Sequence, residues 1–237
     1  MDTVLTEISL QGLVIAFLPV AVVVGIMLRW SAGARTALYA TFRMLVQLLL
    51  IGYVLIYIFD SNRPIFILAV LAIMLTVASW IAIRPLQRKN PRIYLNSLGA
   101  ISIGGILTLA LVSQLVLGVE PWFSPRYLVP LAGMIFAGSM NAVSLAAERL
   151  QSELERGTSY LEGRRIALQA ALIPITNSLF AVGLVALPGM MTGQILSGIS
   201  PMVAAKYQIV VMTMLFGASG ISAALYLVLA NKTIKDR

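Results

Sequence analysis

The stretch GMIFAGSMNAVSLAAERL, from Gly133 to Leu150, decides the fold class of this chain. Its first half is apolar enough to lie inside a lipid bilayer, although it contains Asn141, and it ends in the charged pair Glu148 and Arg149. Such a pattern is typical of a helix that crosses the hydrocarbon core and emerges into water at one end. The stretch therefore predicts a membrane-spanning helix with a charged extension.

The composition of the whole chain agrees with this interpretation. Of the 237 residues, 59% are hydrophobic and only 11% are charged, whereas soluble domains contain about 25% charged residues. The net charge of +8 comes from cations in short loops between apolar runs, which favours a role in membrane orientation over binding to nucleic acid. The sequence has no Cys and no His, which excludes disulfides, thiolate or imidazole metal sites and Cys/His catalysis.

Apolar runs of about 20 residues predict an all-α, polytopic integral membrane protein with a single transmembrane domain over residues 1–237. The second span could begin near Gly33, because the residues before position 40 also suit a helix. The N-terminal residues are acidic, unlike a signal peptide, so the first run is expected to be a retained span. The seven predicted spans are about 8–28, 40–59, 64–83, 96–118, 127–147, 167–187 and 203–230.

The loop charges predict that the N-terminus lies outside and the C-terminus in the cytoplasm. With this orientation only Arg63, Arg126 and Lys206 lie outside, and the other 14 of the 17 Lys and Arg residues lie inside, as the positive-inside rule requires. The inside cations are Arg29, Arg35, Arg43, Arg84, Arg88, Lys89, Arg92, Arg149, Arg156, Arg164, Arg165, Lys232, Lys235 and Arg237.

The fifth span carries an amide on one helical stripe. The stripe consists of Met134, Gly138, Asn141, Leu145 and Glu148, and small residues beside it (Gly138, Ala142 and Ala146) allow another helix to approach closely. Because an amide that faces lipid is costly, Asn141 is expected to face another helix or an aqueous path.

The segment 148–166 is expected to be a structured cytoplasmic protrusion. Gly157 suits the end of one helix, and Ser159 with Glu162 suits a capping box at the start of the next. We interpret the protrusion as a docking element for a soluble partner; the alternative is a solvated connector. The candidate coupling residues are Glu148, Arg149, Glu153, Arg156 and Gly157.

The stretch LPGMMTGQILSGISPMVAAKYQIVVM (187–212) is expected to interrupt regular helix, with Ser200 and Pro201 starting the last span. Its polar but uncharged residues fit either a re-entrant gate or an external turn. The gate candidates are Pro188, Gly189, Gly193 and Gly198.

The remaining polar residues of the spans suggest a transport path without a motor. The path candidates are Gln47, Asn141, Asn177 and Gln194. No Asp or Glu lies in the middle of a predicted span, which argues against an ion-coupled transporter and a membrane hydrolase. The sequence contains no P-loop, so we expect a transport subunit that is not an enzyme, binds no cofactor and is driven by a separate ATPase.

Three stretches, GSMNAVSLAAERL (138–150), 187–212 and FRMLVQLLLIGYVL (42–55), closely resemble the Fet-type ABC permeases. This is the bacterial iron-export permease family, which has plant relatives implicated in aluminium tolerance. Without assigned roles, the family pattern falls on Asn141, Glu148, Arg149, Gly189, Gly193, Gln194, Tyr207 and Gln208.

The resemblance implies a permease of the bacterial inner membrane that pairs, as a homodimer, with a cytoplasmic ABC ATPase that binds ATP. The implied substrate is iron or a related metal, with its ligands undetermined. Two alternatives stay open: an ABC permease for a non-metal substrate such as a nucleotide-sugar, and a self-sufficient secondary transporter or channel. A membrane sensor or scaffold is a further class.

Overall fold

The computed structural model describes residues 8–59, 63–87 and 90–235. Every regular element in these ranges is a helix, apart from one isolated β-bridge between Val182 and Ala186, so the predicted all-α class is confirmed. The chain divides into two compact units, residues 1–60 (unit 1) and 61–237 (unit 2).

Unit 1 is a helical hairpin. Its helices are α1 (Leu10–Ala16), α2 (Leu18–Arg29) and α3 (Ala34–Phe59). Ser31 and Gly33 adopt positive φ angles of 54° and 75° in the turn before α3, and α3 begins at Ala34, which confirms the earlier of the two predicted starts. The apolar windows of both long segments are 0% buried within the chain, as expected of helices whose neighbours are lipid tails.

Unit 2 contains the remaining helices. They are α4 (Pro64–Ala82), α5 (Pro91–Ala110), the π-helix η1 (Leu111–Val116), α6 (Pro125–Glu155), α7 (Tyr160–Ala181), α8 (Gly189–Leu196) and α9 (Pro201–Lys235). Four of these helices begin with a proline, whose fixed φ angle suits the first helical position and whose missing N–H costs nothing there. The predicted start at Pro201 is confirmed, and Ser200 caps it by accepting from the Val203 N–H at 3.4 Å.

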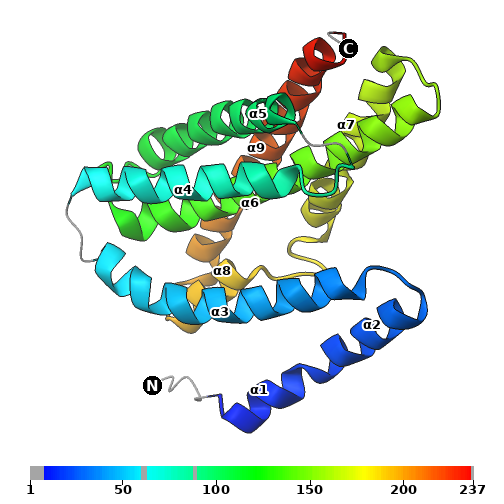
Figure 1. Ribbon diagram of the computed structural model, residues 1–237. Coiled ribbons are helices and arrows are strands. Elements are labelled where there is room, and N and C mark those ends of the chain that lie inside the picture. Colours follow the sequence, from blue (N-terminus) through cyan, green and yellow to red (C-terminus); the bar gives the residue numbers. More distant parts are fainter. Residues whose placement is uncertain (1–7, 60–62, 88–89, 236–237) are drawn as a thin grey trace. The chain divides into compact units, whose positions relative to one another are not determined.

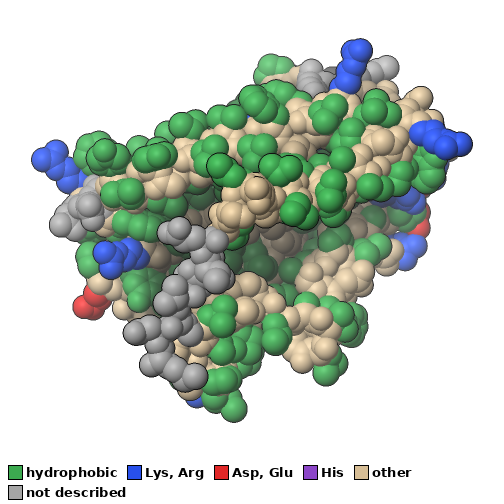
Figure 2. Space-filling view, turned by 90° about the horizontal axis from the view of Figure 1, so that it is seen from below, with side chains coloured by type: hydrophobic (Ala, Val, Ile, Leu, Met, Phe, Trp, Pro, Cys, Tyr) green, Lys and Arg blue, Asp and Glu red, His purple; other side chains and the backbone are tan. Residues whose placement is uncertain are grey.

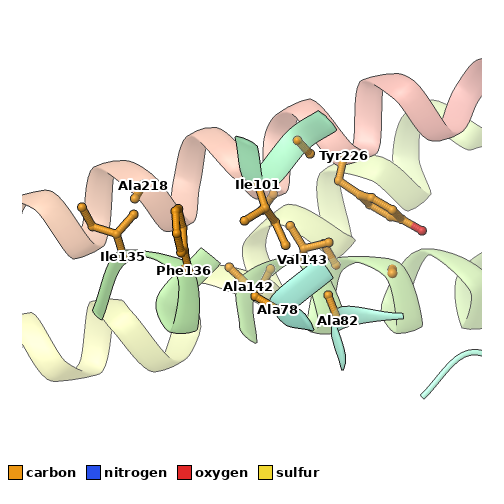
Figure 3. Packing of buried hydrophobic residues seen from close by; sticks show 14 of the residues in the cluster. Ala78, Ala82, Ile101, Ile135, Phe136, Ala142, Val143, Ala218 and Tyr226 are labelled. Atoms are coloured by element: carbon orange, nitrogen blue, oxygen red, sulfur yellow. The ribbon is translucent and has the colours of Figure 1, made fainter. Parts of the chain in front are cut away.

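The core of unit 2 is built around α6. In Figure 1, α4, α5 and α6 run side by side and α9 crosses them, and α6 contacts α4, α5, α7 and α9. The buried residues between these helices are mostly small or β-branched: Figure 3 shows Ala78 and Ala82 of α4, Ile101 of α5 and Ala142 and Val143 of α6. Small side chains let helices approach closely, which supplies the packing contacts that stabilise helices in a bilayer.

The closest approach lies where α5, α6 and α9 meet. A Cβ atom added to Gly104 of α5 would lie 2.4 Å from Ser222 Oγ of α9. The same Ser222 hydroxyl donates a hydrogen bond of 3.1 Å to Ser139 Oγ of α6, and both serines are 0% exposed. A glycine and two hydroxyls therefore hold three helices together at this point.

Six helical segments of the described chain are long and apolar enough to cross a membrane. They are Leu10–Arg29, Ala34–Phe59, Pro64–Ala82, Pro91–Val116, Pro125–Glu155 and Pro201–Asn231. The predicted sixth span, 167–187, coincides with α7 only as far as Ala181, so its predicted end is wrong. The chain turns there at Gly183, whose φ angle is +82°. The number of spans and their orientation stay predictions.

Charged side chains are few on the surface shown in Figure 2: hydrophobic side chains spread across it and most of the Lys and Arg side chains stand at its edges. Of the cations that predict the orientation, Arg88, Lys89, Arg237 and the side chains of Lys232 and Lys235 lie outside the described residues.

Candidate functional site

The predicted cytoplasmic protrusion forms a tight helix–turn–helix, which we call the elbow (residues 148–166). Helix α6 ends at Glu155, and Gly157 takes a left-handed φ angle of +84°, which confirms the predicted end. Ser159 caps α7 by accepting from the Glu162 N–H at 3.4 Å. The Glu162 carboxylate binds Arg165 instead of completing a capping box, with Oε1 2.6 Å from Arg165 Nη2.

Glu153 is the buried centre of the elbow. It is 5% exposed, and its Oε1 lies 2.7 Å from Arg149 Nη2 and 3.7 Å from Arg156 Nη1. Its Oε2 accepts a hydrogen bond of 3.1 Å from the Thr158 hydroxyl. Because a carboxylate shielded from water is costly unless it is paired, this arrangement ties the end of α6 to the turn.

Tyr160 fastens the elbow to the last helix. Its hydroxyl donates a hydrogen bond to the main-chain carbonyl of Leu227 in α9, 67 residues away. Burial raises the pKa of Tyr160, while Arg164 and the main-chain N–H of Asn231 oppose this rise. In the regular hydrogen-bond pattern of an α-helix, the Leu227 carbonyl that Tyr160 binds also accepts from the N–H of Asn231, four residues later.

The outer surface of the elbow combines an apolar side chain with cations. Leu161 is 69% exposed, and the side chains of Arg156 and Arg165 are 65% and 63% exposed. Hydrogen bonding with Arg165 lowers the pKa of Glu162, and the attraction between their charges acts in the same direction. Of the predicted coupling residues, Glu153 and Gly157 thus shape the elbow, whereas Glu148 and Arg156 are exposed.

The stripe predicted on α6 is largely exposed in the structure. Asn141, Leu145 and Glu148 are exposed, and the buried face is instead formed by Ser139, Ala142, Val143, Ala146 and Ala147. The small-residue ladder is confirmed: a Cβ at Gly138 would lie 3.1 Å from Ser219 Oγ of α9. Asn141 therefore does not lie on the α6 face that packs in unit 2, which is the serine–alanine face, and the prediction that it faces another helix or an aqueous path stays a prediction.

The four path candidates lie on four different helices, α3, α6, α7 and α8. Gln47 lies in unit 1, where its amide oxygen, oriented toward Arg43, accepts from Nε at 3.1 Å and from Nη2 at 3.3 Å. Asn141 of α6 and Asn177 of α7 are exposed. Gln194 differs from them, since its Oε1 is shielded from solvent and has no hydrogen-bond partner.

The gate candidates form a short helix. Pro188 is the N-cap of α8, while Gly189 and Gly193 lie within it, so the expectation that these two glycines interrupt helix is wrong. Gly198, with a φ angle of +88°, ends the segment as predicted. Helix α8 packs against α9.

The sequence did not predict the interhelical hydrogen bonds of Tyr160, Ser222 and Ser97. The Ser97 hydroxyl donates to the main-chain carbonyl of Ser79 at 3.1 Å. The glycines at 104, 105 and 138 were a usable signal, because glycines inside apolar helices mark close helix contacts. Among the described residues, no group of three His, Cys, Asp or Glu side chains could hold a metal ion.

These features define a multi-pass α-helical membrane protein with a charged elbow. The family model described as "Uncharacterised protein family (UPF0014)" matches residues 10–234, and the chain belongs to this family. No solved structure matches the chain.

Curated relatives from bacteria and plants match the chain. The chain is 39% identical to "UPF0014 membrane protein slr1647" of Synechocystis sp., over 78% of each chain. It is 34% identical to "Probable iron export permease protein FetB" of Escherichia coli, over 81% of this chain and 75% of the relative. It is 31% identical to "Protein ALUMINUM SENSITIVE 3" of Arabidopsis thaliana, over 78% of this chain and 72% of the relative. The resemblance inferred from the motifs is thus confirmed.

Proposed function

We propose that this chain is the permease subunit of an ATP-driven exporter in the inner membrane and that a separate cytoplasmic ATPase docks on the elbow. The observation that carries the proposal is the elbow itself: Glu153 locks it from inside while Leu161 and Arg165 remain exposed. A connector between two spans needs no buried, doubly paired carboxylate. The name of the Escherichia coli relative, a probable iron export permease, supports the same class.

The contacts of the elbow can transmit a movement of the ATPase to the membrane helices. Tyr160 binds the main chain of α9 at Leu227, and α9 binds α6 through Ser222 and Ser139. A displacement of the elbow therefore acts on both α6 and α9, and alternating access arises when these packed helices shift between two arrangements. In this mechanism ATP is bound and hydrolysed by the partner, and this chain supplies no catalytic residue.

The elbow surface fits a partner with an apolar pocket beside acidic residues. Leu161 provides the apolar contact, and Arg156, Arg164 and Arg165 are exposed cations around the turn. Apolar anchors set affinity at such interfaces, whereas exposed charges mainly set orientation and association rate.

We propose iron or a related metal as the substrate, because of the bacterial relative's name, with a non-metal substrate such as a nucleotide-sugar as the alternative. Two copies of the permease are proposed for the working complex. The exposed Asn141 supports this, since an amide facing lipid is costly and a second copy would cover it. In this cysteine-free chain, oxidation of an Asn141→Cys variant should link two copies, whereas Leu107→Cys on α5 should not; equal linking of both would refute this contact.

The function is tested by reconstituting the protein in liposomes with and without its candidate ATPase and following ferrous iron. Movement that needs both proteins and ATP is the expected result. Complex formation without iron movement would reject iron and keep the architecture, and a nucleotide-sugar would then be assayed in the same vesicles. Movement without the ATPase would refute the proposal and favour a self-sufficient transporter.

The docking surface is tested by copurification of the ATPase with a Leu161→Ala/Arg164→Ala variant. Both side chains are exposed, so the fold should be retained while the ATPase is lost. The matched control is Leu184→Ala, which removes a 90% exposed leucine at the opposite end of α7. Retention of the ATPase by the double variant would remove the elbow from the proposed interface.

A further inference from the structure

In unit 2, two of the described glutamines have amide oxygens that are shielded from solvent and accept no hydrogen bond. In the described part of the chain, Oε1 of Gln194 and Oε1 of Gln208 have no hydrogen-bond partner. They belong to α8 and α9, which pack against each other. The remaining atom of this kind, Arg149 Nε, belongs to the charged elbow.

Gln208 lies on the buried stripe of α9. It is 5% exposed, and its helical neighbours Ala204, Val211 and Met212 are 0%, 5% and 8% exposed. The adjacent Ile209 is 63% exposed and marks the outer face of the helix. An amide oxygen buried among apolar side chains without a hydrogen bond is strongly disfavoured, and in a membrane protein such groups mark substrate or ion paths.

The position of Gln208 along α9 suits access from one end of the bundle. It follows Pro201, the first residue of α9, by seven positions, which is about 10 Å along the helix axis at 1.5 Å per residue. Gln194 lies in the short helix that immediately precedes α9. Both amides are therefore at the α8 end of the last span, far along the chain from the elbow.

We propose that the amide oxygens of Gln194 and Gln208 form a polar site on the translocation path that accepts hydrogen bonds from O–H groups of the substrate. Amide oxygens accept hydrogen bonds and are hard ligands, so they suit the coordinated water of a hydrated metal ion or the hydroxyls of a sugar. The site rests on the proposed export function, and it deepens that function by naming where the substrate is held.

The test is thiol labelling of single-cysteine variants. Because the chain has no cysteine, the Gln194→Cys and Gln208→Cys variants carry one thiol each. They are reconstituted with the ATPase and treated with a charged, membrane-impermeant methanethiosulfonate, alone and with ferrous iron or UDP-glucose. Ile209→Cys is the control for the lipid-facing side of the same turn, and Ala218→Cys, at a fully buried position, is the control for packing.

The expected result is labelling at positions 194 and 208, slowed severalfold by one of the two ligands, with both controls unlabelled. The protecting ligand identifies the source of the O–H groups. Failure to label position 208 with or without ATP would overturn the site, as would labelling that neither ligand slows or equal labelling of Ile209→Cys. If wild-type vesicles export normally in those cases, the proposed function stands and only the site fails.

A second variant separates a site from a packing role. Gln208→Leu keeps a similar volume and removes the unpaired amide oxygen, so the protein should be as thermostable as wild type or more so. Transport should fall about tenfold, as expected when one substrate hydrogen bond is lost. The control is Gln169→Leu, which changes an exposed glutamine of α7 and should leave transport unchanged. Normal transport by Gln208→Leu would overturn the proposal.

Discussion

Replacing Gly104 with alanine should force apart the helices that meet at the centre of unit 2. The new Cβ would lie 2.4 Å from Ser222 Oγ, 3.0 Å from Ser222 N and 3.3 Å from Ile221 Cγ2. The hydroxyl can rotate, but only by giving up its 3.1 Å hydrogen bond to Ser139. The main-chain nitrogen cannot move without moving α9, so α5 and α9 must separate.

The size of the effect follows from three terms. Overpacking a well-packed core costs about 1–3 kcal/mol, and loss of the Ser222–Ser139 hydrogen bond costs about 1 kcal/mol. Alanine is more favourable than glycine inside a helix by about 1 kcal/mol, which offsets part of this. The net destabilisation is about 1–3 kcal/mol, and at about 2–4 °C per kcal/mol for a chain of this length it lowers Tm by about 2–12 °C.

The assay is thermal unfolding in detergent, followed by loss of the monodisperse peak. Gly217→Ala is the matched control, because Gly217 also lies in a helix but has nothing within 4 Å of its added Cβ; this variant should be equally stable or more stable. Adding Ser222→Ala to Gly104→Ala should recover part of the loss, since the closest atom is removed. A Gly104→Ala protein as stable as Gly217→Ala would refute the reasoning.

Three further predictions concern the elbow. Tyr160→Phe should lower stability by about 1 kcal/mol and raise the ATP hydrolysed per substrate moved, because it cuts the bond to Leu227; Tyr127→Phe, at an exposed tyrosine, is the control, and an unchanged ratio would exclude a coupling role. Glu153→Gln should lower the free energy of unfolding by about 1–3 kcal/mol, because it removes a buried charge that pairs two arginines. The loss stays in this range because both arginines are partly exposed to water. The exposed control Glu155→Gln should change the free energy of unfolding by less than about 0.5 kcal/mol. The lowered pKa of Glu162 means that its bond to Arg165 stabilises the elbow above the unfolded carboxyl pKa of about 4.3 and is lost as pH falls through the folded value. The protection of residues 160–165 against hydrogen exchange, measured relative to the intrinsic exchange rate at each pH, should therefore fall in acid, and a Glu162→Gln protein with the same acid step would contradict this.

The sequence alone determined the membrane class, the helical fold and most helix ends. With only 11% charged residues, the chain has too few charged side chains to cover the surface of a water-soluble protein. Apolar runs of about 20 residues in a bilayer satisfy their main-chain hydrogen bonds as helices. The ends at Gly157, Ser159 and Pro201 were predictable because capping involves residues within one helical turn. The end of α7 was missed because the apolar residues after Ala181 continue into a turn.

Only the tertiary structure decided which face of each helix is buried and which distant groups meet. In a soluble helix the apolar face is the core face, but lipid is as apolar as a protein interior, so the pattern of α6 does not say whether Asn141 or Ser139 packs inside. The contact between Tyr160 and Leu227 joins residues 67 positions apart, and Gln208 is only 5% exposed although its neighbour Ile209 is 63% exposed. Such contacts depend on how the helices pack, and no local interaction in the sequence encodes them.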